Sequence, residues 1–124
     1  MCKNDFYINR GDVYWALLSN ADAAAKNDAD SSVQKGKRPV IVIQNNVGNA
    51  YSRTVIVAPV TSKCKKSLPV HVAVSKKETG LPLDSVVLLE QITTINKNQL
   101  VSFIGKVNLN TMQRIDKAIE ISIL

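Results

Sequence analysis

The chain has 124 residues, 45% of them hydrophobic and 21% charged, which is typical of one globular domain that needs no disulfide to hold its core. Lys and Arg number 16 against 10 Asp and Glu, so the net charge of +6 favours a polyanionic partner. Cys2 and Cys64 lack the spacing of a metal site, we see no secretory leader, and no apolar run approaches the ~20 residues of a membrane span. We therefore expect a cytoplasmic protein with reduced thiols and no membrane contact.

The N-terminal third of the chain contains one predicted strand and one long connection. Residues 1–9 show no period and are expected to fray. A strand is predicted over residues 12–18, with Trp15 in the core. Residues 19–37 then form a connection rich in Asn, Asp, Ala and Ser, whose charges cancel. A connection of this length without structure is usually functional or disordered.

Two almost continuously apolar, β-branched runs, residues 40–44 and 54–60, predict neighbouring strands buried on both faces and joined by a loop rich in Asn and Gly. Pro39 at the start of the first run forces Arg38 into an extended conformation. If the strands are antiparallel, Arg38 and Thr61 lie at one rim of the sheet. A guanidinium and a hydroxyl together suit a phosphate.

The polar residues after Thr61 can each be interpreted as ordinary surface or as part of a binding site. The lysines of residues 62–67 are either solvated surface or a group that attracts phosphate. His71, on a strand over residues 68–74, faces away from the apolar side and is expected to be exposed, as ordinary surface or as a ligand contact. Residues 84–92 predict a further buried strand whose end is polar.

The C-terminal part predicts a last strand over residues 101–107 and a helix capped by Asn108 or Asn110, whose stripe of Leu109, Met112, Ile115 and Ile119 is typical of core or dimer packing. Several short strands with one terminal helix indicate a mainly β (α+β) fold, a small and strongly bent β-barrel.

Five blocks of this sequence, in order and with few gaps, resemble the MazF/PemK toxins of bacterial toxin–antitoxin pairs: residues 10–16, 38–45, 54–58, 68–72 and 84–92. The resemblance covers nearly the whole chain, so we treat residues 1–124 as a single toxin domain. It implies an SH3-like barrel with a C-terminal helix, as in MazF, PemK and CcdB, and a homodimer.

The residues leave few routes to catalysis. One histidine, two distant cysteines and scattered carboxylates do not make a metal ligand set, and neither a nucleophile elbow nor a glycine-rich phosphate loop is present. RNA can cleave itself by attack of its own 2′-OH, so a protein need only align that hydroxyl and stabilise charge. The resemblance implies this reaction on single-stranded RNA at short motifs, without metal or cofactor, giving 2′,3′-cyclic phosphate and 5′-OH ends.

Matching this sequence to the family position by position implies which residues form the site. Arg38 matches the family's catalytic arginine and would stabilise the phosphorane, and Thr61 matches its catalytic threonine and would orient the phosphate or the 2′-OH. Six further positions match places that line the RNA groove: Ser32, Gln34, Pro69, His71, Glu90 and Gln91. Lys37, next to Arg38, is predicted as an additional RNA contact. Upstream of Arg38 the family commonly has Gly-Ser-Glu-Gln-Gly-Gly, of which this chain keeps only part, so its sequence preference is expected to differ.

The resemblance also implies a partner, a small acidic MazE-like antitoxin whose disordered C-terminal segment covers the RNA groove. Two alternatives remain open at this point. One is a non-enzymatic toxin of the CcdB type, which binds DNA gyrase through its dimer surface and needs no Arg-plus-Thr site. The other is an RNA-binding module that has lost its chemistry.

Overall fold

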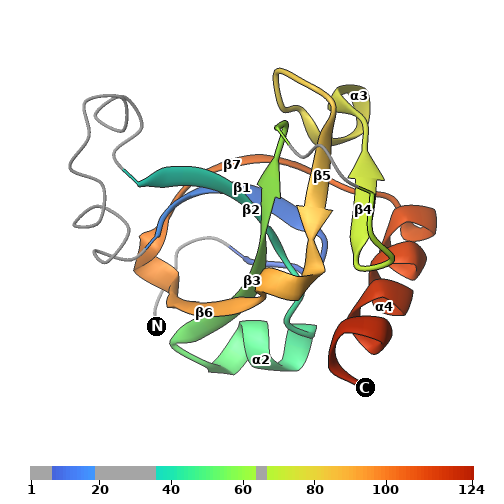
Figure 1. Ribbon diagram of the computed structural model, residues 1–124. Coiled ribbons are helices and arrows are strands. Elements are labelled where there is room, and N and C mark those ends of the chain that lie inside the picture. Colours follow the sequence, from blue (N-terminus) through green and yellow to red (C-terminus); the bar gives the residue numbers. More distant parts are fainter. Residues whose placement is uncertain (1–6, 19–35, 64–66) are drawn as a thin grey trace.

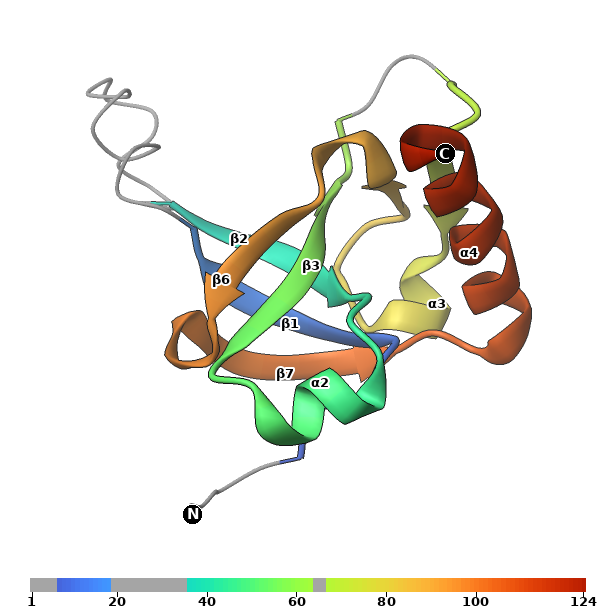
Figure 2. The same cartoon turned by 90° about the horizontal axis from the view of Figure 1, so that it is seen from below.

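The computed structural model describes residues 7–18, 36–63 and 67–124, and its strands form one antiparallel sheet that bends strongly around a core (Figures 1 and 2). The strands are β1 (Asp12–Leu17), β2 (Lys37–Val42), β3 (Thr54–Thr61), β4 (His71–Val74), β5 (Ser85–Leu88), β6 (Thr93–Asn96) and β7 (Leu100–Lys106). The helices are α2 (Asn46–Tyr51), α3 (Lys76–Thr79) and α4 (Leu109–Ile123), with 3₁₀ turns η2 (Leu89–Gln91) and η3 (Lys97–Gln99).

The sheet has the strand order β4-β5-β3-β2-β1-β7, with β6 also paired to β3. Within the described residues it does not close, because β4 and β7 remain its edges. The predicted barrel is therefore a strongly bent, open sheet with a C-terminal helix beside it. None of the helices that the structure describes is long and apolar enough to cross a membrane.

Strand β3 is the centre of this sheet. On one edge it pairs with β2 between Val40↔Pro59 and Val42↔Val57, so the two apolar runs are antiparallel neighbours, as predicted. On the other edge its first half pairs with β6 and its last two residues pair with β5. The 3₁₀ turn η2 connects β5 to β6 and therefore lies along the same edge of β3.

Both faces of β2 and β3 are buried, as their uninterrupted apolar sequences predict. The cluster on one face includes residues of α4 and of the β4–β5 pair: Val13, Ile41, Ala58, Val60, Val72, Val87, Leu89, Met112, Ile115 and Ala118. The cluster on the opposite face is built by the other strands and the N-terminal segment: Ile8, Tyr14, Ala16, Val40, Val42, Val55, Val57, Ile95 and Leu100. Both clusters hold β3 in place, so residues at its end have a rigid support.

Several local predictions were wrong. The Asn- and Gly-rich loop contains the helix α2, because the Asn45 side chain accepts a bond from the Gly48 N–H at 2.9 Å and so caps a helix. Part of the segment expected to fray is ordered, since Ile8 is buried in the second cluster. The stripe of α4, predicted for core or dimer packing, has Met112 and Ile115 buried in the core and Leu109 81% exposed in the single chain. Trp15 is only half-buried, although it packs against the first cluster.

The motif at residues 10–12 ties three segments together, its own, the end of the first apolar run and α4. The Asp12 carboxylate accepts from the Asn9 N–H at 2.9 Å. The Arg10 guanidinium donates to the Ile43 carbonyl and to Asp116 of α4, both at 2.7 Å. This block of the sequence therefore has a structural role.

Asp12 predicts a pH dependence of stability. It is 3% exposed, and burial raises the pKa of its carboxyl above 3.8, while the Asn9 N–H and Lys106 act in the opposite direction. The folded protein holds the proton of the Asp12 carboxyl more tightly than the unfolded chain does. Protonated Asp12 therefore contributes fully to the free energy of unfolding below pH 3.8, and this contribution is lost as pH rises through the raised pKa.

We therefore expect the difference in unfolding free energy, wild type minus Asp12→Asn, to fall as pH rises through this window and then to level off. Urea unfolding of both proteins from strongly acidic to neutral pH measures it. A difference that grows with pH would contradict this account of Asp12.

Candidate functional site

Arg38 and Thr61 lie at the same end of two neighbouring strands. The last pair of the β2–β3 ladder toward this end is Val40↔Pro59, and each candidate residue lies two positions beyond it. On its other edge Arg38 pairs with Ala16 of β1. The shared rim that the sequence predicted is present, but β2 and β3 diverge there, as both views show (Figures 1 and 2). Arg38 and Thr61 therefore lie at the ends of two strands that no longer pair with each other there.

Pro39 explains why the pairing of β2 and β3 stops. The odd-numbered residues of β2 face β3, as the bond from the Ile43 N–H to the Ile56 carbonyl shows, so Pro39 stands where the next N–H toward β3 would be, and proline has none. On the opposite edge of β3, Val60 pairs with Val87 of β5. Pro39 was predicted as the first residue of its strand, but β2 begins at Lys37, so the proline lies inside it. The same residue that extends Arg38 thus also ends the pairing.

Both candidate side chains project from the same face of the sheet. Strand residues alternate between faces, and Arg38 shares parity with Val40, while Thr61 shares parity with Val57. Val40 and Val57 belong to the cluster opposite α4. Arg38 and Thr61 therefore continue that face beyond the edge of the core, where water and a ligand can reach them.

The two groups are chemically available. Arg38 is exposed, and no carboxylate of the described residues pairs with it. The Thr61 Oγ1 accepts from the Lys63 N–H at 3.0 Å, which leaves its hydroxyl hydrogen to donate. A guanidinium that is not neutralised and a free O–H donor make an anion site. Each of the two side chains can therefore donate hydrogen bonds to a phosphate.

His71 differs from its prediction. Its side chain is 7% exposed, and its Nε2 lies 3.0 Å from Oε2 of Glu90, which is 36% exposed. The Leu68 N–H points to Nδ1 at 3.4 Å, and Nε2 faces the Glu90 carboxylate. Alternation placed His71 on the correct face, but a partner 19 residues later in the sequence covers it.

The predicted RNA contacts are partly brought together. Glu90 and Gln91 are exposed on η2, beside β3, and Lys37 adjoins Arg38 at the start of β2. Pro69 is exposed just before β4. Of the predicted RNA contacts, Ser32 and Gln34 lie outside the described residues, and so do Cys2, Cys64 and the lysines Lys65 and Lys66. In residues 7–18, 36–63 and 67–124, no three His, Cys, Asp or Glu side chains gather as a group that could hold a metal ion.

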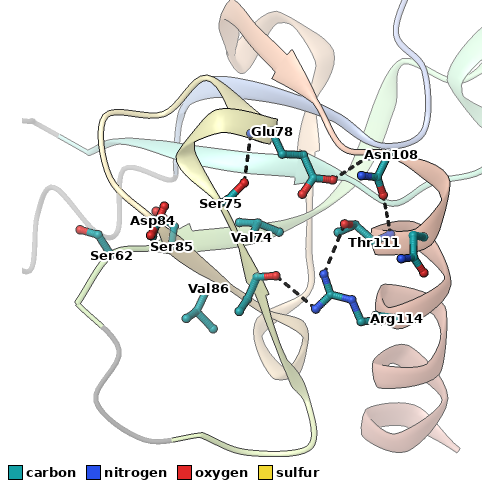
Figure 3. A pocket seen from close by; sticks show the side chains of 12 residues that line it. Ser62, Val74, Ser75, Glu78, Asp84, Ser85, Val86, Asn108, Thr111 and Arg114 are labelled. Carbon is teal, nitrogen blue, oxygen red and sulfur yellow. Dashed lines mark hydrogen bonds between the residues drawn. The ribbon is translucent and has the colours of Figure 1, made fainter.

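Sequence reasoning missed a pocket next to this site. It has a volume of about 660 Å³ and lies between β4, β5, α3 and the first turns of α4 (Figure 3). Its lining includes Ser62, Glu78, Asp84 and Arg114. These residues lie up to 52 positions apart, 114 minus 62, and form no motif, so only the fold reveals them.

Comparison with known proteins gives a consistent result. Residues 9–123 match the family described as "PemK-like, MazF-like toxin of type II toxin-antitoxin system". The chain is 44% identical over 117 residues to "Endoribonuclease EndoA" of Bacillus subtilis (strain 168), covering 94% of both chains. It resembles the structure of a mycobacterial "Endoribonuclease in complex with its cognate antitoxin", with a TM-score of 0.72, 24% identity and 92% of each chain covered. A MazE–MazF structure from Deinococcus radiodurans has a TM-score of 0.68 at 16% identity, with 93% of each chain covered.

Proposed function

This chain belongs to the PemK-like, MazF-like toxins of type II toxin–antitoxin systems, and we propose that Arg38 and Thr61 carry its cleavage of single-stranded RNA. Family membership and the 44% identity to an endoribonuclease make it an endoribonuclease toxin. They do not favour the CcdB-type alternative. The observation that carries the site assignment is the exposed guanidinium, without a carboxylate partner among the described residues, at the parted strand ends.

In the proposed mechanism the 2′-OH next to the cut attacks the phosphorus, and the 5′-oxygen of the following nucleotide leaves. The attack adds negative charge to the phosphate oxygens, which the Arg38 guanidinium stabilises by donating hydrogen bonds. The Thr61 hydroxyl donates to the same phosphate and fixes its orientation. The products are a 2′,3′-cyclic phosphate and a 5′-OH, and no cofactor enters this scheme.

The RNA strand on either side of the cut would contact the polar residues around β3. The Glu90 carboxylate can only accept hydrogen bonds, so it suits the N–H groups of an unpaired base, and His71 holds it in place. We assign Lys37, Pro69 and Gln91 to contacts with the strand as well, and Ser32 and Gln34 by resemblance alone. We further infer that the toxin acts in the cytoplasm, where its RNA substrate is.

The direct test is incubation of the purified protein with a long RNA of mixed sequence. We expect a limited set of fragments whose ends are 2′,3′-cyclic phosphate and 5′-OH. Inhibition of DNA gyrase without cleavage would support the CcdB-type reading instead. Binding of RNA without cleavage would show a module that has lost its chemistry.

We also propose a homodimer and control by an acidic antitoxin. The antitoxin's carboxylates can occupy positions meant for phosphates, since the chain carries a net charge of +6. We expect a peptide with the acidic C-terminal half of the protein encoded beside this gene to inhibit cleavage in competition with RNA. Cleavage assays at increasing RNA concentration measure this. Tight binding of the peptide with cleavage unchanged would rule out blocking of the groove.

A further inference from the structure

The pocket beyond Thr61 is continuous with the candidate site through the sheet. Thr61 pairs with Val86 of β5, and Val86 pairs in turn with Ala73 of β4. Val86 and Ala73 both line the pocket, and so does Ser62, the residue after Thr61. Two strand spacings separate Thr61 from Ala73, about 10 Å. A strand of RNA with its scissile phosphate at Thr61 therefore has this pocket beside it.

Arg114 of α4 lies at the far side of this row. Its Nη1 donates to the Ala73 carbonyl and its Nη2 to the Thr111 hydroxyl, each at 3.3 Å (Figure 3). These are long bonds for a guanidinium, and they use two of its five N–H groups. Arg114 therefore has donors left for a ligand in the pocket.

Acceptors come from the other walls of the pocket. The Glu78 carboxylate accepts from the Asn108 N–H, and the Asp84 carboxylate from the Lys76 N–H, both at 2.8 Å. Each bond fixes one carboxylate and leaves lone pairs on its oxygens. The hydroxyl groups of Ser62 and Ser75, which can donate or accept, complete the polar lining.

The charges in the pocket limit the kinds of ligand that can bind there. Glu78, Asp84 and Arg114 sum to −1, which opposes a phosphate group. The two carboxylates also repel an acidic antitoxin segment. A neutral ring with both acceptors and N–H donors can bond to Arg114 and to one of the carboxylates, and nucleobases with an exocyclic amino group have that edge.

We propose that this pocket is a base-binding subsite for the substrate, which holds one amino-bearing nucleobase on the strand that flanks the cut. Arg114 donates to a ring nitrogen or carbonyl of that base, and Asp84 or Glu78 accepts from its amino group. The subsite rests on the proposed endoribonuclease function and adds a determinant of its sequence preference. Adenine, cytosine and guanine fit this arrangement better than uracil, which has no amino group.

The experiment compares cleavage patterns of three variants with the wild type. Sequencing the 5′-OH ends of a digested mixed-sequence RNA gives the base preference at each position around the cut. For Arg114→Ala we expect a relaxed preference at one flanking position and about a tenfold lower kcat/KM on the preferred RNA, mainly through KM. Asp84→Asn keeps the bond to the Lys76 N–H but replaces an acceptor with a donor, so the preference at that position should shift toward uracil. Lys117→Ala removes an exposed cation of α4 outside the pocket and should change neither.

Binding to a catalytically inactive background separates this subsite from the chemistry. In Arg38→Ala protein, adding Arg114→Ala should weaken binding of the preferred RNA oligonucleotide about tenfold. If Arg114→Ala and Asp84→Asn keep the wild-type motif and affinity, the subsite is wrong, although Arg38→Ala inactivity would still support the proposed function. Weaker antitoxin binding with unchanged RNA cleavage, or dissociation of a dimer into monomers, would assign the pocket to a protein contact and overturn the proposal.

Discussion

Arg38→Ala is expected to lower the kcat/KM for RNA cleavage by on the order of 10²-fold or more, without unfolding the protein. The guanidinium is exposed and pairs with no carboxylate of the described residues, so its removal should change stability by no more than about 0.5 kcal/mol. Activity is lost because the Arg38 guanidinium stabilises negative charge that develops on the phosphate only in the transition state. Cleavage of a fluorescent oligonucleotide that carries the preferred motif measures it, and thermal unfolding checks the fold.

Arg53 supplies the matched control. It is an exposed arginine immediately before β3, at the opposite end of the strand that ends in Thr61. Arg53→Ala removes the same charge and should leave cleavage nearly unchanged. At the site itself, Thr61→Ala should lose activity and Thr61→Ser should retain most of it, because serine keeps the hydroxyl. Full activity of folded Arg38→Ala protein would end the assignment of this site.

A substrate with hydrogen in place of the 2′-OH at the cut is expected to show no cleavage at all. In the proposed reaction that hydroxyl is the nucleophile, so no side chain can replace it. A deoxy substitution one nucleotide away is the control and should be cut. Product formation on a gel under single-turnover conditions gives the result directly. Cleavage of the deoxy substrate would show that water or a protein group attacks instead.

Adding EDTA and raising the salt concentration also test the proposed mechanism. Excess EDTA should leave the rate unchanged, since Arg38 and Thr61 supply the charge and orientation in this mechanism. Rising salt should weaken the reaction, because RNA phosphates bound by lysine and arginine release counterions. Activity that EDTA abolishes and Mg²⁺ restores would require a different account of the chemistry.

The features predicted correctly from the sequence are those that depend on residues close together in the chain. β2 and β3 were expected because each is an unbroken apolar run, and that run has one stable arrangement, buried on both faces. The position of Arg38 and Thr61 at one end followed from antiparallel pairing alone. α2 was missed because asparagines and a glycine are typical of a loop, and the cap made by Asn45 depends on geometry.

Features that depend on distant residues could not be predicted. His71 was expected to be exposed because nothing near it in the sequence indicates Glu90 as its partner. The pocket needs β4, β5, α3 and α4 in their folded places before Arg114 faces Asp84 and Glu78. The alternation of side chains along a strand predicts which face of the sheet a residue occupies. Which residues then cover that face depends on the topology of the whole chain.

Pro39, at the end of the β2–β3 ladder, also sets a limit on how stable this enzyme can become. A residue with an N–H in place of Pro39 would let the strands continue pairing, and each added bond would contribute about 1 kcal/mol. The continued ladder would occupy the space where the scissile phosphate binds. Selection for tighter folding and selection for toxicity therefore act in opposite directions on the same backbone position, and a stabilised variant found by screening should be searched for changes there first.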